Sequence, residues 1–131
     1  MAVSKLDVVA RIEATYEARI ARDYPTALLG FAADARFRFI GRQDIFPFMG
    51  LHVGHAAILA ALVSIDRMFS IGDFFMEDIL IDGDRGAARW SAMIRNLETG
   101  VGYEFEAFDH LILRDGKIIS FTEFADTSRM I

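Results

Sequence analysis

The hydrophobic pattern of the chain changes to a two-residue period after Gly72, and this change constrains the fold more than any other feature. The alternating segments are residues 74–81, 87–96, 101–114 and 117–126. Side chains of a β-strand point alternately to the two faces of a sheet, and the Gly- and Asp-rich connections between these segments are typical of hairpin turns. The sequence therefore predicts four consecutive strands in a meander.

Helical periodicity precedes these strands. Apolar side chains recur at three- and four-residue spacing near the start of the chain, namely Leu6, Val9, Ile12, Tyr16 and Ile20, which indicates an amphipathic helix. Asp23 is expected to cap a short second helix that carries Pro25 in its first turn. Residues 55–69 predict a third helix with a broad apolar face.

The segment between the second and third helices is less regular. Residues 35–41, "ARFRFIG", are expected to form a strand, whereas residues 42–54 contain the second proline and are expected to form a loop. Helices that come ahead of an antiparallel sheet indicate the α+β class. Because no repeat or linker interrupts the chain, a single domain is expected over residues 1–131.

Composition excludes several classes of protein. Hydrophobic residues make up 53% and charged residues 25% of the chain, which excludes a disordered protein. No apolar run reaches about 18 residues and residues 1–20 are read as a helix, not a signal peptide, so a cytoplasmic protein without a membrane segment is expected. The net charge of −5 and the scattered Lys and Arg argue against nucleic acid as a partner. The absence of cysteine excludes disulfides and thiolate chemistry.

The stretch "EFEAFDHLILRDG" places a carboxylate among the apolar side chains of one strand face. Asp109 shares that face with Tyr103, Phe105, Ala107, Leu111 and Leu113. An unpaired buried carboxylate is costly, so such groups shift their pKa, find a partner or line a cavity. Asp109 is therefore the first candidate for a functional group.

Several stretches resemble the nuclear-transport-factor-2-like fold, and more narrowly its SnoaL-like and ketosteroid-isomerase-like families. They are "FAADARFRFIG" (31–41), "PFMGLHVGHAAILAAL" (47–62), "FDHLILRDGKI" (108–118) and "FTEFADT" (121–127). The resemblance implies a cone-shaped α+β barrel, in which three N-terminal helices pack into a strongly curved mixed or antiparallel sheet around an apolar cavity. Isomerases, cyclases, epoxide hydrolases, dehydratases and non-catalytic binders share this fold, so the fold alone does not name the reaction.

The isomerase relatives use a Tyr on the first helix, a protonated Asp on a late strand and a carboxylate base on the first strand. The resemblance carries the Tyr onto Tyr16, the Asp onto Asp109 and the base onto or near Ile40. Ile40 cannot abstract a proton, which argues against steroid isomerisation by the family mechanism. SnoaL-like polyketide cyclases use an acidic residue on the sheet wall without that base, so a cyclase-type reaction stays open.

Each candidate also has a structural interpretation. Asp109 is either a cavity acid or donor of raised pKa, or a carboxylate satisfied by Tyr16 or the backbone. Tyr16 is either a second donor or a core residue whose hydroxyl needs a partner. Trp90 and Phe105 are expected to form a wall for a ligand, and a core position for Trp90 stays open. The chain register is expected to set Trp90 close to Asp109.

The orientation of Glu123 depends on the turn before it. A three-residue loop with a bulge at Gly116 turns Glu123 inward beside Asp109, whereas a two-residue turn turns Thr122 inward, because a slip of one residue exchanges the faces. The family resemblance favours the first arrangement. Two inward carboxyls would raise one another's pKa and form an acid/base pair.

The histidines give no metal site. His52 and His55 are three residues apart without an obvious third ligand, and His110 points to the face opposite Asp109. His52 is expected to reach the cavity mouth and contact a ligand. The sequence thus implies neither a metal nor another cofactor.

The chain contains twelve Phe and six Met and has a positive mean hydropathy. This composition suggests more apolar surface than one small core can bury. The outer face of the strands mixes charged with large apolar groups, namely Met93, Glu104, Glu106, Phe108, His110 and Ile112. This pattern predicts a homodimer through the outer sheet face.

The leading hypothesis is an acid/base enzyme for an apolar, oxygen-bearing molecule of polyketide, terpenoid or steroid type. The alternatives are a non-catalytic binding module of the same fold and a dimer whose cavity is filled by its own side chains.

Overall fold

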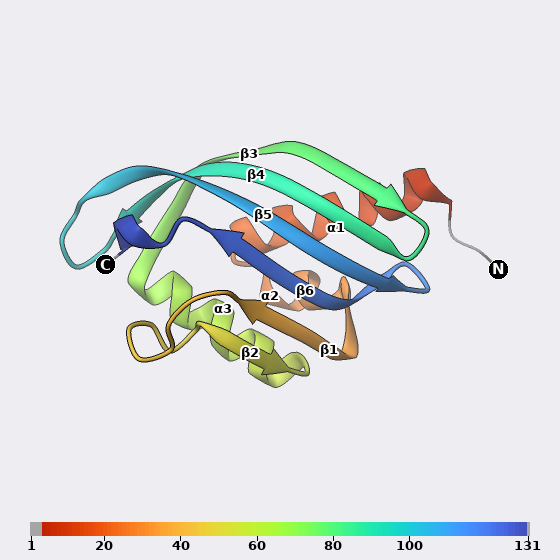
Figure 1. The fold of residues 1–131 in the computed structure, drawn as a ribbon, viewed down its shortest axis with the longest axis horizontal. Helices are drawn as coiled ribbons and strands as arrows, with labels where there is room; N and C mark the ends of the chain where they lie inside the picture. The colour runs from red at the N-terminus through yellow and green to blue at the C-terminus, as the bar shows by residue number, and fades with distance from the viewer. Residues whose placement is uncertain (1–3, 131) are drawn as a thin grey trace.

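The computed structural model describes residues 4–130, which form three α-helices and a six-stranded sheet (Figure 1). The elements are α1 (Lys5–Ile20), α2 (Tyr24–Leu29), β1 (Phe31–Phe39), β2 (Gly50–Val53), α3 (His55–Met68), β3 (Phe69–Asp82), β4 (Arg85–Asn96), β5 (Gly102–Arg114), β6 (Lys117–Ala125) and the short 3₁₀ helix η1 (Ser128–Met130). None of these helices is long and apolar enough to cross a membrane.

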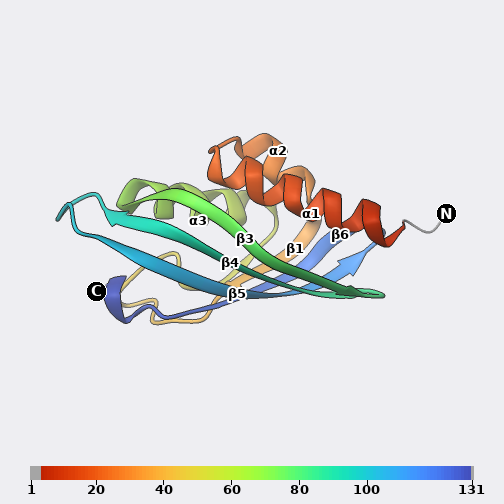
Figure 2. The ribbon, with the colours of Figure 1, turned by 90° about the horizontal axis from the view of Figure 1, so that it is seen from above.

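The sheet has the strand order β2-β1-β6-β5-β4-β3 and does not close. Strands β1 and β6 are parallel and all other neighbours are antiparallel, so the sheet is mixed. All three helices cover one face of the twisted sheet and leave the other face bare of helices (Figure 2). The predicted α+β architecture of helices packed into a curved mixed sheet is therefore confirmed.

Local sequence signals set the two first helices. Ser4 caps α1 by accepting a hydrogen bond from the Asp7 amide at 3.2 Å, and Asp23 caps α2 by accepting from the Thr26 amide at 3.3 Å. The predicted apolar stripe of α1 is wrong at Leu6, which is 82% exposed. The helix turns Val8 inward instead, together with Ile12 and Tyr16.

The strands extend beyond their predicted limits at three places, the first being β1, which begins at Phe31 and not at Ala35. Residues 50–53 were expected to lie in a loop but form β2, because residues 36–39 of β1 offer an edge to which they pair. Strand β3 begins at Phe69 and not at Phe74, because its first residues pair with the end of β4, where Phe69 lies opposite Asn96. Pairing with a distant strand decides the boundaries of β2 and β3, and local periodicity does not report it.

The β5–β6 hairpin decides which side chains of β6 face inward. Its turn has two residues, Asp115 and Gly116, both with positive φ, so the three-residue loop expected at this point is wrong. The register then shifts: Leu113 pairs with Ile118 but Ile112 pairs with Ser120, which leaves Ile119 as a bulge. This bulge restores the inward orientation of Glu123, which lies opposite Asp109.

The core fills the space between the helices and the concave face of the sheet. Its centre is a group of aromatic rings from β1 and β6, where Phe37 stacks on Phe121 at a centroid distance of 4.7 Å and meets Phe39 edge-on at 4.9 Å. Ile12 of α1 and Ile58 of α3 close the core from the helical side and are almost fully buried. The aromatic packing leaves a cavity beside α1.

Candidate active site

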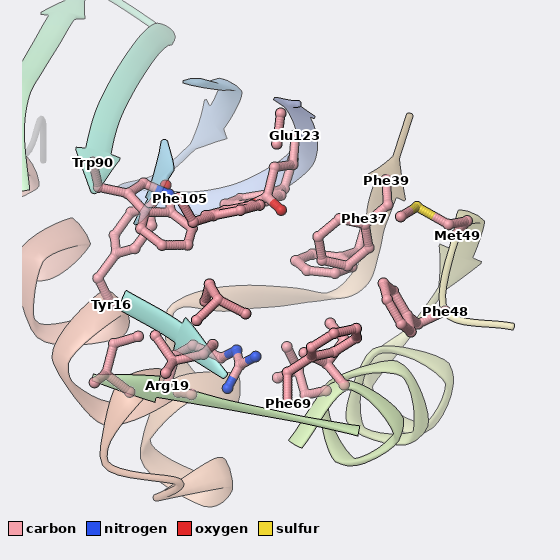
Figure 3. Close-up of a pocket in the computed structure, with 18 of the residues that line it drawn as sticks. Tyr16, Arg19, Phe37, Phe39, Phe48, Met49, Phe69, Trp90, Phe105 and Glu123 are labelled. Atoms are coloured by element: carbon pink, nitrogen blue, oxygen red, sulfur yellow. The ribbon is translucent and has the colours of Figure 1, made fainter. Parts of the chain in front are cut away.

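A cavity of about 80 Å³ lies between the helices and the concave sheet face. Aromatic and aliphatic side chains form most of its wall (Figure 3). Trp90, Phe105 and Tyr16 gather around one part, whereas Phe48, Met49 and Phe69 gather around another. Polar groups are few, and the two ionisable side chains that reach this wall besides Tyr16 are Arg19 and Glu123.

Asp109 is fully buried directly behind this wall. Its Oδ2 accepts hydrogen bonds from the Tyr16 hydroxyl and from Trp90 Nε1, the latter at 2.8 Å. Because Asp109 is not among the lining residues, the expectation that it forms the cavity wall is corrected: the side chains of Tyr16, Trp90 and Glu123 stand between it and the open space. The physical reason is length, since a short Asp side chain cannot pass its larger neighbours.

Glu123 is the carboxyl that faces the cavity. It lies opposite Asp109 in the strand register and is 8% exposed. Burial, the charge of Asp109 and a hydrogen bond to Asp109 raise the pKa of Glu123 well above its ordinary value, and the charge of Arg19 opposes this shift. Burial beside Asp109 therefore favours the protonated form of this side chain.

The two carboxyls influence one another's proton affinity. Burial raises the pKa of Asp109 to about 6, while hydrogen bonds from Tyr16, Glu123 and Trp90 act in the opposite direction. Asp109 Oδ1 is buried without a hydrogen-bond partner among the described residues, and Glu123 lies opposite Asp109 in the register. The pair is therefore arranged so that a proton on Glu123 can be donated to Asp109.

Tyr16, Trp90 and Phe105 form an aromatic wall around the pair. Burial, followed by the charge of Asp109, raises the pKa of Tyr16 well above its ordinary value, so its hydroxyl remains a donor. The Trp90 and Phe105 rings lie 5.5 Å apart between centroids. All three side chains line the cavity, as the sequence predicts, and Trp90 is a direct neighbour of Asp109.

Ile40 lines the cavity where the family resemblance expects a base. Its amide donates to the Glu123 carbonyl at 3.2 Å, which ties the end of β1 to β6. The nearest carboxylate along the chain, Asp44, is exposed and paired with Arg42. This position therefore offers an apolar contact and no proton acceptor.

His52 does not reach the cavity, which corrects the expectation placed on it. It belongs to β2, where its Nε2 lies 2.7 Å from the Phe48 carbonyl, and it is absent from the cavity wall. His55 lies at the start of α3 with its Nε2 2.9 Å from the Phe31 carbonyl. Within residues 4–130 no three His, Asp or Glu side chains cluster in a way that would hold a metal ion.

Sequence reasoning missed Arg19. This side chain lines the cavity and pairs with Asp66 of α3, whose carboxylate is 6% exposed. A signal existed, because Arg19 follows Tyr16 by three residues and so lies on the same face of α1. Its partner Asp66 could not be foreseen, since the contact joins residues far apart in sequence.

Residues 12–121 match the model of the SnoaL-like domain, which is most of the chain. The protein belongs to the SnoaL-like domain family. No curated protein matches the sequence significantly.

Solved structures show the same fold at low sequence identity. An NTF2-like protein of unknown function from Burkholderia pseudomallei has a TM-score of 0.85 at 19% identity, covering 95% of this chain and 94% of that one. TerC, crystallised with polyporic acid, has a TM-score of 0.83 at 20% identity, covering 94% of each chain. A candidate polyketide cyclase from Xanthomonas campestris has a TM-score of 0.75 at 20% identity, covering 95% and 93%. At such identities these SnoaL-like and NTF2-like neighbours establish the architecture and not the reaction.

Proposed function

We propose that this SnoaL-like protein is a small-molecule enzyme that performs acid/base chemistry on an apolar, oxygen-bearing ligand in its cavity. The observation that carries the proposal is the Glu123–Asp109 pair, in which Glu123 faces an apolar space, Asp109 lies buried behind it, and burial raises the pKa of both carboxyls. A buried carboxyl pair that shares a proton is a common source of an acid with a pKa near neutrality.

The roles follow from which atoms reach the cavity. Glu123 is proposed as the catalytic residue that gives a proton to a carbonyl or enolate oxygen of the ligand and takes one back. Asp109 is proposed as a positioning residue, because its charge and its hydrogen bond set the pKa of Glu123. Tyr16 lines the cavity, but its hydroxyl bonds Asp109, so it acts as a ligand donor only if that bond is exchanged.

The size of the cavity limits the ligand. Drug-sized ligands occupy about 300–1,000 Å³, whereas this cavity has about 80 Å³. A ring system of polyketide, terpenoid or steroid type therefore requires the phenylalanine side chains or Met49 to move outward. The neighbour crystallised with polyporic acid and the candidate polyketide cyclase support such ligands for this fold.

Ligand entry is tested through Trp90, the single tryptophan of the chain. Its fluorescence is recorded while polyporic acid, aromatic polyketides, steroids and terpenoids are titrated near neutral pH. Saturable quenching or a spectral shift is expected, because Trp90 lines the cavity. An unchanged spectrum across the panel would show that the aromatic side chains stay closed.

The first prediction concerns Glu123→Gln. The glutamine amide can still donate to Asp109 but cannot transfer a proton, so ligand affinity should change less than about threefold while turnover of the best binder falls about 100- to 10,000-fold. The matched control is Asp44→Asn, an exposed carboxylate outside the cavity wall, which should leave both unchanged.

A non-catalytic binding module of the same fold is the second candidate. The observation that favours it is Ile40, an apolar residue at the position where isomerase relatives hold their base. Under this alternative the protein binds its tightest ligands without converting them into products. The Glu123→Gln variant then binds these ligands as tightly as the unaltered protein does. Turnover that survives Glu123→Gln would instead assign the chemistry to another group.

A further inference from the structure

Arg19 is a cation in the wall of a cavity whose other lining groups are almost all apolar. Its side chain is 16% exposed and comes from α1, one helical turn after Tyr16. Figure 3 shows its guanidinium nitrogens and the carboxyl oxygen of Glu123 directed into the space between the aromatic side chains. A charge at this depth calls for an explanation beyond packing.

Within the described residues, Nη1 is the one guanidinium nitrogen of Arg19 that forms a hydrogen bond. Arg19 Nη1 donates to both carboxylate oxygens of Asp66, at 2.9 and 3.1 Å. The Nε and Nη2 groups donate to no acceptor within residues 4–130. A planar guanidinium offers donors in a fixed fork that matches two oxygens of one ligand, so the free edge is shaped for a second partner.

The contacts of Asp66 hold this free edge in place. The Asp66 carboxylate also accepts from the Tyr24 hydroxyl at 2.6 Å, and its main-chain carbonyl accepts from Arg22 Nη2 at 3.4 Å. These bonds fix the carboxylate between α1, α2 and α3. Because Asp66 is anchored on three sides, Arg19 keeps its orientation without help from a ligand, which lowers the entropy that binding costs.

The acids Glu123 and Asp109 form no hydrogen bond with Arg19 within the described residues. Burial and Asp109 raise the pKa of Glu123, which favours its neutral form, and the Asp109 carboxylate is fully buried behind the aromatic wall. Arg19 is the one basic side chain among the described residues of the cavity wall, and its partner Asp66 is not part of that wall.

We propose that the cavity selects acidic ligands, in which an apolar ring carries a carboxylate, an ionised enol or a phenolate whose oxygens accept from Nε and Nη2 of Arg19. This inference rests on the proposed function and names the class of its substrate. Arg19 is a specificity-determining residue, and Glu123 remains the group that moves the proton. Hydrogen bonds between charged partners are about twice as strong as neutral ones, so a neutral isostere loses affinity.

The experiment compares acids with their primary amides by isothermal titration calorimetry near neutral pH. Benzoate and 2-naphthoate are expected to bind the unaltered protein about 10- to 100-fold more tightly than benzamide and 2-naphthamide. In Arg19→Gln the preference should disappear while the amides keep their affinity. Arg22→Gln is the matched control, because Arg22 also bonds Asp66 but does not line the cavity, and it should keep the preference.

The outcomes separate this inference from the proposed function. Amides that bind the unaltered protein as tightly as the acids overturn the inference and leave the acid/base proposal standing, and this comparison needs no variant to fold. An acid preference that survives in Arg19→Gln also overturns it. If neither acids nor amides bind while a ligand of the Trp90 fluorescence panel does, the inference is overturned and the proposed function stands. If that panel also fails to bind, both fall.

Discussion

At the scale of single residues, the carboxyl pair makes the stability of the protein depend on pH in an unusual direction. Burial raises the pKa of Asp109 from 3.8 to about 6 and raises that of Glu123 as well. The folded protein therefore keeps protons that the unfolded chain has already lost above about pH 4. Unfolding releases protons in this range, so raising the pH favours unfolding.

The second prediction follows from this sign. The free energy of unfolding should fall as the pH rises from 5 to 8, by an amount on the order of 1–3 kcal/mol for the pair. Urea unfolding followed by Trp90 fluorescence at several pH values measures it. The double variant Asp109→Asn with Glu123→Gln retains the three histidines but not the pair, and its stability should vary less. An equal slope in both proteins would assign the effect elsewhere.

Some residues of the site can be predicted from the sequence and others cannot. Asp109 is visible because a strand alternation surrounds it with apolar side chains, and Tyr16 is visible because it lies on a helical stripe. Their hydrogen bond confirms that the two elements meet. Glu123 reaches the cavity and Asp109 does not, because the Asp side chain is shorter and the side chains of Tyr16, Trp90 and Glu123 lie between it and the cavity. A local sequence pattern does not report such packing.

At the scale of elements, the sequence predicts helices and strands where one rule acts alone. The cap at Asp23 defines the start of α2, and the two-residue period defines β4 and β5. Prediction from sequence fails where pairing between two distant segments determines the structure. Strand β2 is an example, because it forms by pairing with the edge of β1. The bulge at Ile119 is such a case, because the turn at Asp115 and Gly116 gives a register that only the bulge corrects.

The contact between α1 and the start of β1 gives the third prediction. A Cβ atom on Gly30 would lie 2.0 Å from Thr15 Oγ1 and 2.9 Å from its Cγ2. Gly30 has an ordinary helical φ of −74°, so alanine meets a steric conflict and not backbone strain. Gly30→Ala should lower the free energy of unfolding by about 1–3 kcal/mol, as measured by urea unfolding.

A second substitution identifies the conflict as the cause. Thr15→Ala removes Oγ1 and Cγ2, so the double variant should recover part of the loss and show a coupling energy of about 1 kcal/mol. Gly72→Ala is the matched control, because its Cβ would meet nothing within 4 Å. Equal effects of the two glycine substitutions would mean that space at Thr15 is not what matters.

At the scale of the whole molecule, the order of helices and strands predicts the α+β class, and the family resemblance implies the curved mixed sheet into which the helices pack. A chain that changes once from helical to two-residue periodicity can pack its helices and strands in few ways. The helices pack on one face of the four-strand meander. The volume of the cavity was beyond the sequence, because it depends on how twelve Phe side chains share the interior. Packing at that precision is a property of the assembled chain.

The sheet face that no helix covers exposes several large apolar side chains to solvent. Its exposed large apolar residues come from five strands and are Leu51, Val53, Phe75, Leu80, Met93, Phe108 and Phe124. Phe108 and Phe124 are neighbours in the register of β5 and β6 and are 48% and 50% exposed. Exposed apolar side chains on one sheet face are typical of an interaction surface, and we propose that a second copy of the chain covers this face.

The last prediction tests this surface through Phe108→Glu. Position 108 is 48% exposed on the outer face, and Arg89 opposite it already pairs with Glu106, so the new carboxylate stays solvated in the single chain and the fold should be kept. In a twofold dimer each substitution acts twice, so a buried carboxylate pair should convert a dimer into a monomer in analytical ultracentrifugation at micromolar concentrations. Leu6→Glu, at an 82% exposed position of α1, is the control and should stay dimeric. A protein that sediments as a monomer without any substitution would contradict the proposal, and the apolar face would then need another partner.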